Sequence, residues 1–180
     1  EAKEYDFSFN HRIRNILEYD GVRLKAEANT FFDNIDFDYS KTECTEKGAL
    51  SPIYTLGDRS LTSFKPIEIA LEVDENIPLN LHSKLYVGEL SVKKEWVCVG
   101  GTVMFNWITF KTNNLGSYRI MIDTIPPTIT CNSLKANTSN YVGNKNKIDV
   151  YIKDNQSGIK SYYPTINGKR LNEILFFPIG

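Results

Sequence analysis

Histidines and cysteines are the residues best suited to metal binding or nucleophilic catalysis in this 180-residue chain. His11 and His82 are far apart, and neither has a second ligand at metal-binding spacing. Cys44, Cys98 and Cys131 form no CxxC pair, and no G-x-S-x-G motif marks a serine nucleophile. We therefore expect no catalytic residues, no metal site and no cofactor. We interpret the three cysteines as small core residues or half-buried thiols, with one disulfide between an unassigned pair as the alternative.

Two acidic stretches carry the oxygen ligands that calcium prefers. In residues 33–39, Asp36 and Asp38 would share one strand face, but EF-hand spacing is absent. We interpret this stretch as a solvated strand face that alternates with apolar residues. A glycosidase would need its two carboxylates on opposite sides of a cleft, which one strand face does not supply. In residues 154–158 we expect Asp154 to cap a tight turn that Gly158 completes.

Aromatic side chains are the candidate ligand contacts. The chain has ten tyrosines, ten phenylalanines and two tryptophans, and flat aromatic rings stack on the apolar faces of sugars. Tyr162 and Tyr163 precede a proline and are expected at the surface. Trp107 is the third candidate. For a tryptophan, burial between two sheets is the competing interpretation.

Alternation of apolar and charged side chains predicts antiparallel strands. Residues 22–28, 67–73, 118–123 and 148–153 each place apolar side chains on one face and charged side chains on the other. Glycine-containing turns agree with this interpretation. Gly100-Gly101 predicts a two-residue hairpin, Asn167-Gly168 predicts a second, and residues 114–117 predict a further reversal. The predicted class is all-β.

Two consecutive prolines, Pro126 and Pro127, mark a domain boundary because they remove two backbone donors and hold the chain extended. We predict a tandem of immunoglobulin-like antiparallel β-sandwiches. Residues 18–123 form the first sandwich, 124–127 a hinge, and 128–180 a second module that is short or truncated. Residues 1–17 are interpreted as an N-terminal segment or the tail of an upstream module.

Charge and hydropathy limit the classes of partner that we expect for this chain. The net charge of −1 gives no basic excess, so a nucleic-acid partner is not expected. The apolar runs are only a few residues long, so no transmembrane segment is expected. The chain opens with Glu1 rather than Met, which we interpret as a mature or trimmed form.

A resemblance to a known protein class rests on three stretches. A strand runs into a D-x-x-P-P-x-I junction at residues 123–129, a D-x-x-S-G-I turn follows at 154–159, and Ile166-Asn167-Gly168-Lys169 comes after it. Together they resemble the immunoglobulin-like region that follows the catalytic domain in lysostaphin-like murein metallopeptidases of Bacteroidetes-type cell envelopes. That family binds zinc through H-x-x-x-D and H-x-H motifs. Neither His11 nor His82 stands in one, so no catalytic residue carries over.

The resemblance implies an extracytoplasmic, secreted bacterial protein in the periplasm, outer membrane or cell surface. Thr124, within Asp-Thr-Ile, also resembles an O-glycosylation acceptor of such cells. We expect a non-catalytic envelope or surface accessory protein, not an enzyme, that acts as a spacer or protein-binding module. One alternative is a carbohydrate-binding β-sandwich that contacts an envelope glycan. Another is the remnant of a murein endopeptidase that has lost its catalytic domain. We also expect edge-strand self-association of the shorter module.

Overall fold

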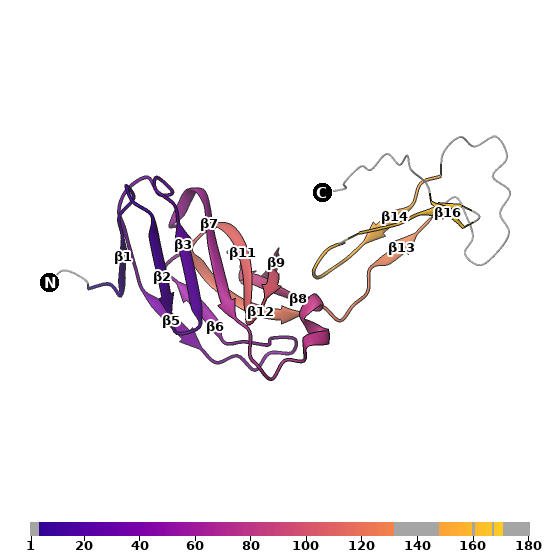
Figure 1. Ribbon diagram of the computed structural model, residues 1–180, viewed down its shortest axis with the longest axis horizontal. Helices are drawn as coiled ribbons and strands as arrows, with labels where there is room; N and C mark the ends of the chain where they lie inside the picture. The colour runs from indigo at the N-terminus through magenta and orange to yellow at the C-terminus, as the bar shows by residue number, and fades with distance from the viewer. Residues whose placement is uncertain (1–3, 132–147, 160, 167, 171–180) are drawn as a thin grey trace. The chain divides into compact units, whose positions relative to one another are not determined.

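The computed structural model describes residues 4–131, 148–159, 161–166 and 168–170 (Figure 1). Its internal contacts divide the chain into two units, Glu1–Thr124 and Ile125–Gly180. Apart from one 3-10 helix, η1 (Leu79–Lys84), the regular elements among these residues are strands, and every strand pair is antiparallel. The predicted all-β class is therefore confirmed. No helix in the described part of the chain is long and apolar enough to span a membrane.

The first unit is a sandwich of two five-stranded sheets (Figure 1). Sheet I has the order β10-β11-β7-β3-β2, formed by Thr102–Met104, Trp107–Asn114, Thr62–Glu72, Val22–Ala26 and Asn15–Tyr19. Sheet II has the order β5-β6-β12-β8-β9, formed by Tyr39–Thr42, Ile53–Leu56, Gly116–Ile122, Leu85–Leu90 and Trp96–Gly100. A two-stranded sheet pairs β1 (Phe7–Phe9) with β4 (Ile35–Phe37).

The core lies between sheets I and II, and the predicted alternation builds it. In β3, Val22 and Leu24 are buried while Arg23 between them is exposed. β7 buries Ile67, Ile69 and Leu71 in the same way, and sheet II contributes residues such as Leu56, Tyr118 and Ile120. Each fully buried Leu or Ile side chain contributes about 1.5–3 kcal/mol to folding, so the facing sheets stabilise each other.

The described residues before position 18 pack with this sandwich rather than forming a separate segment. β2 pairs along its whole length with β3, and β1 pairs with β4. Phe9 is buried in the core, and its ring packs edge-to-face against Phe37 with centroids 5.1 Å apart. The alternating Phe7 and Phe9, which the sequence analysis assigned to a tail, face the core because they supply the apolar side of β1. The first module therefore begins before residue 18.

The predicted hairpin at Gly100-Gly101 is wrong. β9, which ends at Gly100, pairs with β8 in sheet II, and β10, which begins after Gly101, pairs with β11 in sheet I. The chain crosses here from one sheet to the other. Gly101 has φ +138°, and a Cβ on it would lie 2.8 Å from the side chain of Ile108. The glycine is therefore needed for close approach to the core. The reversal predicted at residues 114–117 is likewise a crossing, from β11 in sheet I to β12 in sheet II.

The second unit contains two two-stranded sheets among its described residues. β13 (Thr128–Thr130) pairs with β14 (Tyr151–Lys153), and β15 (Thr165–Ile166) pairs with β16 (Lys169–Arg170). The last pair confirms the predicted hairpin between Ile166 and Lys169, although Asn167 of its turn lies outside the described residues. The Asp154 turn is also confirmed, because its Oδ1 accepts hydrogen bonds from the backbone N–H of Gln156 (2.8 Å) and Gly158 (2.9 Å). Residues 132–147 and 171–180 of the predicted second module lie outside the described residues.

Candidate functional site

Trp107 lies on the outer face of sheet I. In β11, Ile108, Phe110 and Thr112 face the core, so the strand alternation directs Trp107 outward. The ring is half-buried because the guanidinium of Arg23, from β3, lies 3.8 Å from its centroid. Arg23 is held in turn by Glu18, with Nη2 and Oε1 2.9 Å apart. The Trp107 ring is therefore held in place by the Arg23 guanidinium on the outer face of the sheet.

Two exposed apolar side chains extend the surface around Trp107. Met104 stands opposite Trp107 in the β10–β11 register and is 64% exposed. Phe105, in the turn between these strands, is 88% exposed and has φ +54°. The turn is tied to β7 because Val73 N–H donates to the carbonyl oxygen of Asn106 at 2.7 Å. We call Trp107, Arg23, Met104 and Phe105 the Trp107 surface.

The second tryptophan lies on the outer face of sheet II. Trp96 is half-buried, and the guanidinium carbon of Arg119 lies 3.9 Å from its ring centroid. Arg119 is only 2% exposed, and its Nη1 contacts Glu46 Oε2 at 2.6 Å and Cys44 Sγ at 3.1 Å. We call these four residues the Arg119 cluster. Neither tryptophan fills the space between the sheets, so the interpretation of burial between sheets is wrong for both.

Tyr162 and Tyr163 are exposed residues of the second unit. The guanidinium carbon of Arg170 lies 4.7 Å from the Tyr163 ring centroid. The three predicted ligand contacts are thus divided between two units, with Trp107 in the first. Thr124, the predicted glycosylation acceptor, is exposed at the end of the first unit.

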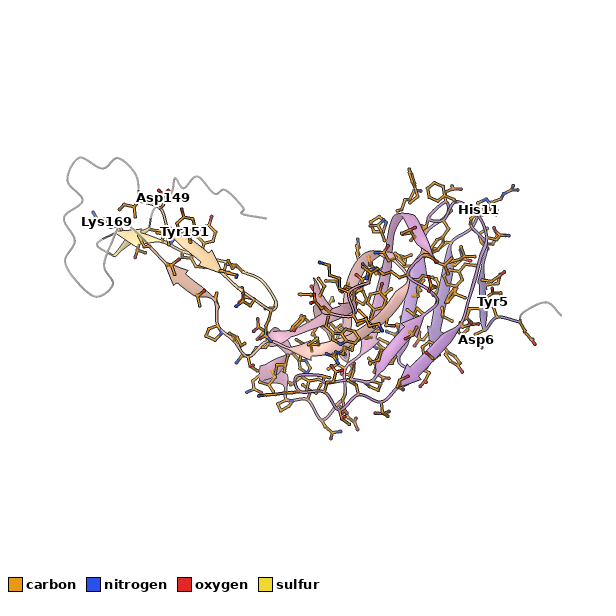
Figure 2. The ribbon with its side chains drawn as sticks, turned by 180° about the vertical axis from the view of Figure 1, so that it is seen from behind. Tyr5, Asp6, His11, Asp149, Tyr151 and Lys169 are labelled. Carbon is orange, nitrogen blue, oxygen red and sulfur yellow. The ribbon has the colours of Figure 1, made fainter. Side chains whose placement is uncertain are left out.

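The acidic stretch at residues 33–39 is only partly a strand, because β4 ends at Phe37 and Asp38 lies between β4 and β5, so the prediction that Asp36 and Asp38 share one strand face is wrong. Phe37 is buried in the core and Ile35 packs against it, while Asp36 is exposed. Asp36 and Asp38 line a groove of about 480 Å³, and Tyr5, labelled in Figure 2, is another of its lining residues. Hydrogen bonds from the Ser60 side chain and backbone lower the pKa of Asp58, a third carboxylate there. The other lining residues are Phe37, Tyr39, Ser40, Thr55, Gly57, Ser60 and Leu61.

Both histidines make polar contacts, His11 in a turn and His82 within η1. His11, labelled in Figure 2, has its Nδ1 2.9 Å from Asn34 Oδ1, and His82 Nε2 is 3.2 Å from the Ile77 carbonyl oxygen. The described residues contain no group of three or more His, Cys, Asp or Glu placed to hold a metal ion. Cys44, Cys98 and Cys131 are all half-buried, in line with the thiol interpretation.

The profile of the Zu5-like domain matches residues 7–123. The chain belongs to the Zu5-like domain family. No curated protein matches the chain. The matched range begins at β1 and ends just before Thr124, so the Zu5-like domain contains both the Trp107 surface and the Arg119 cluster. Tyr162 and Tyr163 lie beyond it. The immunoglobulin-like assignment made from the sequence stays a prediction.

Sequence reasoning identified Trp107 and missed its neighbours in the Zu5-like domain. The predicted glycine hairpin concealed the true β10–β11 turn, and with it the exposed positions of Met104 and Phe105. The signal available was local: the Phe105-Asn106 pair interrupts two apolar runs, and asparagine is common in turns. Arg23 was correctly assigned to the outer face of its strand, but its contact with Trp107 depends on β7 lying between β3 and β11.

Proposed function

We propose that this Zu5-like domain is a non-catalytic protein-binding module whose contact area is the Trp107 surface. The observation that carries the proposal is Phe105, an exposed aromatic residue in a left-handed backbone conformation. Such a conformation costs an L-residue about 1–2 kcal/mol. Exposing the ring forgoes the stabilisation that its burial would bring. A folding requirement alone would favour glycine or asparagine there, so a phenylalanine at this position points to a role outside folding.

The composition of the surface fits a protein partner. Tryptophan, aromatic side chains, methionine and arginine are enriched at the centres of protein interfaces, and Trp and Arg dominate their binding energy. Arg23 already fixes the Trp107 ring through the 3.8 Å contact. A partner that covers this ring therefore pays little side-chain entropy, because the tryptophan is ordered before binding.

The cellular location of the module is part of the same proposal. We infer that it works in the cell envelope or at the cell surface, as a spacer or a docking platform for a protein. The support is the resemblance of residues 115–170 to the region that follows the catalytic domain in murein metallopeptidases. The same resemblance also supports an alternative, in which the chain is the remnant of a murein endopeptidase that has lost its catalytic domain.

The groove beside Tyr5 favours an envelope glycan as a second candidate ligand. Its carboxylates and hydroxyls offer hydrogen-bonding groups for sugar hydroxyls, and Tyr5 is 44% exposed at its edge. Sugar sites commonly combine such polar groups with an aromatic face. The glycan candidate therefore depends on Tyr5 and Asp36, whereas the protein candidate depends on Trp107 and Phe105.

Site-directed photocrosslinking in an envelope fraction tests the protein candidate. A benzophenone amino acid replaces Phe105 in one protein and Phe32, a 78% exposed phenylalanine elsewhere in the unit, in another. We expect a discrete protein adduct from position 105 only, competed by unlabelled wild type and not by Trp107→Ala. Equal adducts from both positions, or equal competition by the variant, would refute the proposal. Binding to purified cell-wall glycan that is lost on Tyr5→Ala and kept on Trp107→Ala would assign the function to the groove.

A further inference from the structure

We propose that one end of the first unit binds the surface of a membrane that contains anionic phospholipids. Three exposed apolar side chains carry this inference, and we call them the Phe32 patch. Phe32 is 78% exposed, Phe64 is 68% exposed and Ile13 is 57% exposed. The Phe32 and Phe64 rings pack edge-to-face with centroids 5.6 Å apart, so the two rings form one apolar surface.

Backbone hydrogen bonds join the three segments that carry the patch. The loop between β3 and β4 carries Phe32, and its Thr30 carbonyl oxygen accepts from the N–H of Phe64 in β7 at 2.7 Å. The turn between β1 and β2 carries the third member, and its His11 carbonyl oxygen accepts from Asn29 N–H at 2.7 Å. Figure 2 labels His11 at this end of the sandwich. The fold therefore holds the three apolar side chains at one end of the unit.

The register of β7 places the Phe32 patch and the Trp107 surface at opposite ends of sheet I. Phe64 lies near the start of β7, whereas Glu72 at the end of the strand pairs with Trp107. Phe105 lies in the turn just before Trp107 and so belongs to the far end. The two surfaces can therefore be tested separately, and a substitution at Phe105 is a control for the same substitution at Phe32.

Exposed cations flank the apolar side chains. Arg12 and Arg14 stand on either side of Ile13 in the turn between β1 and β2, and Lys65 is exposed in β7. Lys65 Nζ donates to the Ala28 carbonyl oxygen at 3.1 Å. This cation therefore lies beside the loop that carries the most exposed ring of the patch.

Two carboxylates reduce this positive charge without cancelling it. Glu27 Oε1 is shared between Arg14 Nε at 3.5 Å and Lys25 Nζ at 3.1 Å. Asp33 Oδ1 lies 3.8 Å from His11 Nδ1. With the other two cations of the rim, four basic side chains stand against two acidic ones, which leaves an excess of two positive charges (4 − 2) with His11 neutral. An anionic headgroup layer complements that excess.

An apolar patch with a cationic rim fits the boundary between lipid headgroups and acyl chains. Amphipathic segments at this boundary bury their apolar side chains in it, while Lys and Arg contact anionic headgroups. The rings protrude, and a fluid membrane accepts protruding side chains without a matching hollow, which a folded protein partner would have to supply. Apolar burial therefore supplies the affinity, and the cations supply the preference for anionic lipid.

Vesicle co-sedimentation of the full chain tests the proposal. The vesicles contain either phosphatidylcholine alone or phosphatidylcholine mixed with phosphatidylglycerol. We expect at least about fivefold stronger binding to the mixed vesicles, weakened by added salt. Phe32→Asn should lower that binding at least about fivefold because the ring no longer enters the apolar layer, and Phe105→Asn should leave it unchanged. Absence of binding to the mixed vesicles, or an equal loss with both variants, overturns the proposal.

A pair of charge variants tests the cationic rim. Arg12→Gln should weaken binding to the mixed vesicles about three- to fivefold and leave binding to phosphatidylcholine unchanged. Lys84→Gln is the matched control, because Lys84 is an exposed lysine at the end of η1 and precedes β8, whose first residue pairs with the last residue of β12. Equal weakening by both variants would mean that net charge alone attracts the vesicles, and the Phe32 patch would not be the contact.

Photocrosslinking gives an answer even where Phe32→Asn unfolds the unit. A benzophenone amino acid at position 32 keeps an aromatic ring there, and one at position 105 is the control. We expect a lipid adduct with the mixed vesicles from position 32 only, detected by mass spectrometry. No lipid adduct at position 32, or equal adducts at both positions, would contradict membrane contact through this end. A discrete protein adduct from position 32 in an envelope fraction would assign the patch to a protein partner instead.

Discussion

Replacing Phe105 by asparagine should stabilise the Zu5-like domain while weakening partner binding. Phe105 has φ +54°, and this backbone region costs a typical L-residue about 1–2 kcal/mol. Asparagine occupies the same region at lower cost because its short polar side chain hydrogen-bonds locally. The ring is 88% exposed, so its loss removes little buried apolar area. We expect a net gain of about 0.5–1 kcal/mol in the free energy of unfolding.

Urea unfolding followed by tryptophan fluorescence is the appropriate assay for this change. Both tryptophans of the chain lie in the first unit, so the signal reports that unit alone. Phe32→Asn is the control, because Phe32 is 78% exposed, is not among the residues with positive φ, and packs against Phe64 with ring centroids 5.6 Å apart. That variant should lose stability. A similar loss for Phe105→Asn would mean that ring contacts outweigh backbone strain and would refute the argument for a functional phenylalanine.

Three further predictions address the crossing, the core and the two tryptophans. Gly101→Ala should cost about 3 kcal/mol, because its Cβ would lie 2.8 Å from a core isoleucine. Gly100 has φ +83°, but a Cβ added there would meet no atom within 4 Å. Gly100→Ala should therefore cost about 1 kcal/mol, as measured by urea unfolding. Burial raises the pKa of Tyr118, so its neutral form is favoured in the folded state. The stability that this burial of the neutral form contributes is fully present below the unfolded-state pKa of about 10 and falls as pH rises above that value. Tyr118→Phe should therefore make the free energy of unfolding depend less on pH in this range, as followed by circular dichroism. Trp96→Ala should destabilise the domain by about 2–3 kcal/mol and Trp107→Ala by about 1 kcal/mol, since only Trp96 covers a buried guanidinium, and thermal unfolding ranks the two.

Local patterning predicted the strands whose two faces meet different surroundings. β3 and β7 were visible because their apolar residues alternate with charged ones, and the structure buries those apolar faces. The hairpin that joins β15 and β16 was visible because an Asn-Gly pair in a sequence favours a two-residue turn. In each case the residues that form the predictive pattern lie within a few positions of one another along the chain.

The features that the sequence did not reveal depend on contacts between distant segments. Gly101 carries the same turn signature as a hairpin glycine, and only its distance to Ile108 shows that it marks a crossing between sheets. Arg119 alternates with apolar residues as a solvent-facing charge would, yet the loop that carries Glu46 covers it. Local periodicity describes which face of a strand a residue occupies, but it contains no information about what lies over that face.

The two arginine–tryptophan pairs show how burial separates a binding surface from a structural cluster. The guanidinium-to-ring distances are nearly equal, 3.8 Å for Arg23 on Trp107 and 3.9 Å for Arg119 on Trp96. The arginine side chains differ, with Arg23 46% exposed and Arg119 3% exposed. A partner can reach the first pair, and the strained, exposed Phe105 lies beside it, which is why we propose sheet I as the binding face. The second pair is closed by the loop that carries Glu46, whose carboxylate contacts the buried Arg119 at 2.6 Å, so on sheet II the same pairing stabilises the fold.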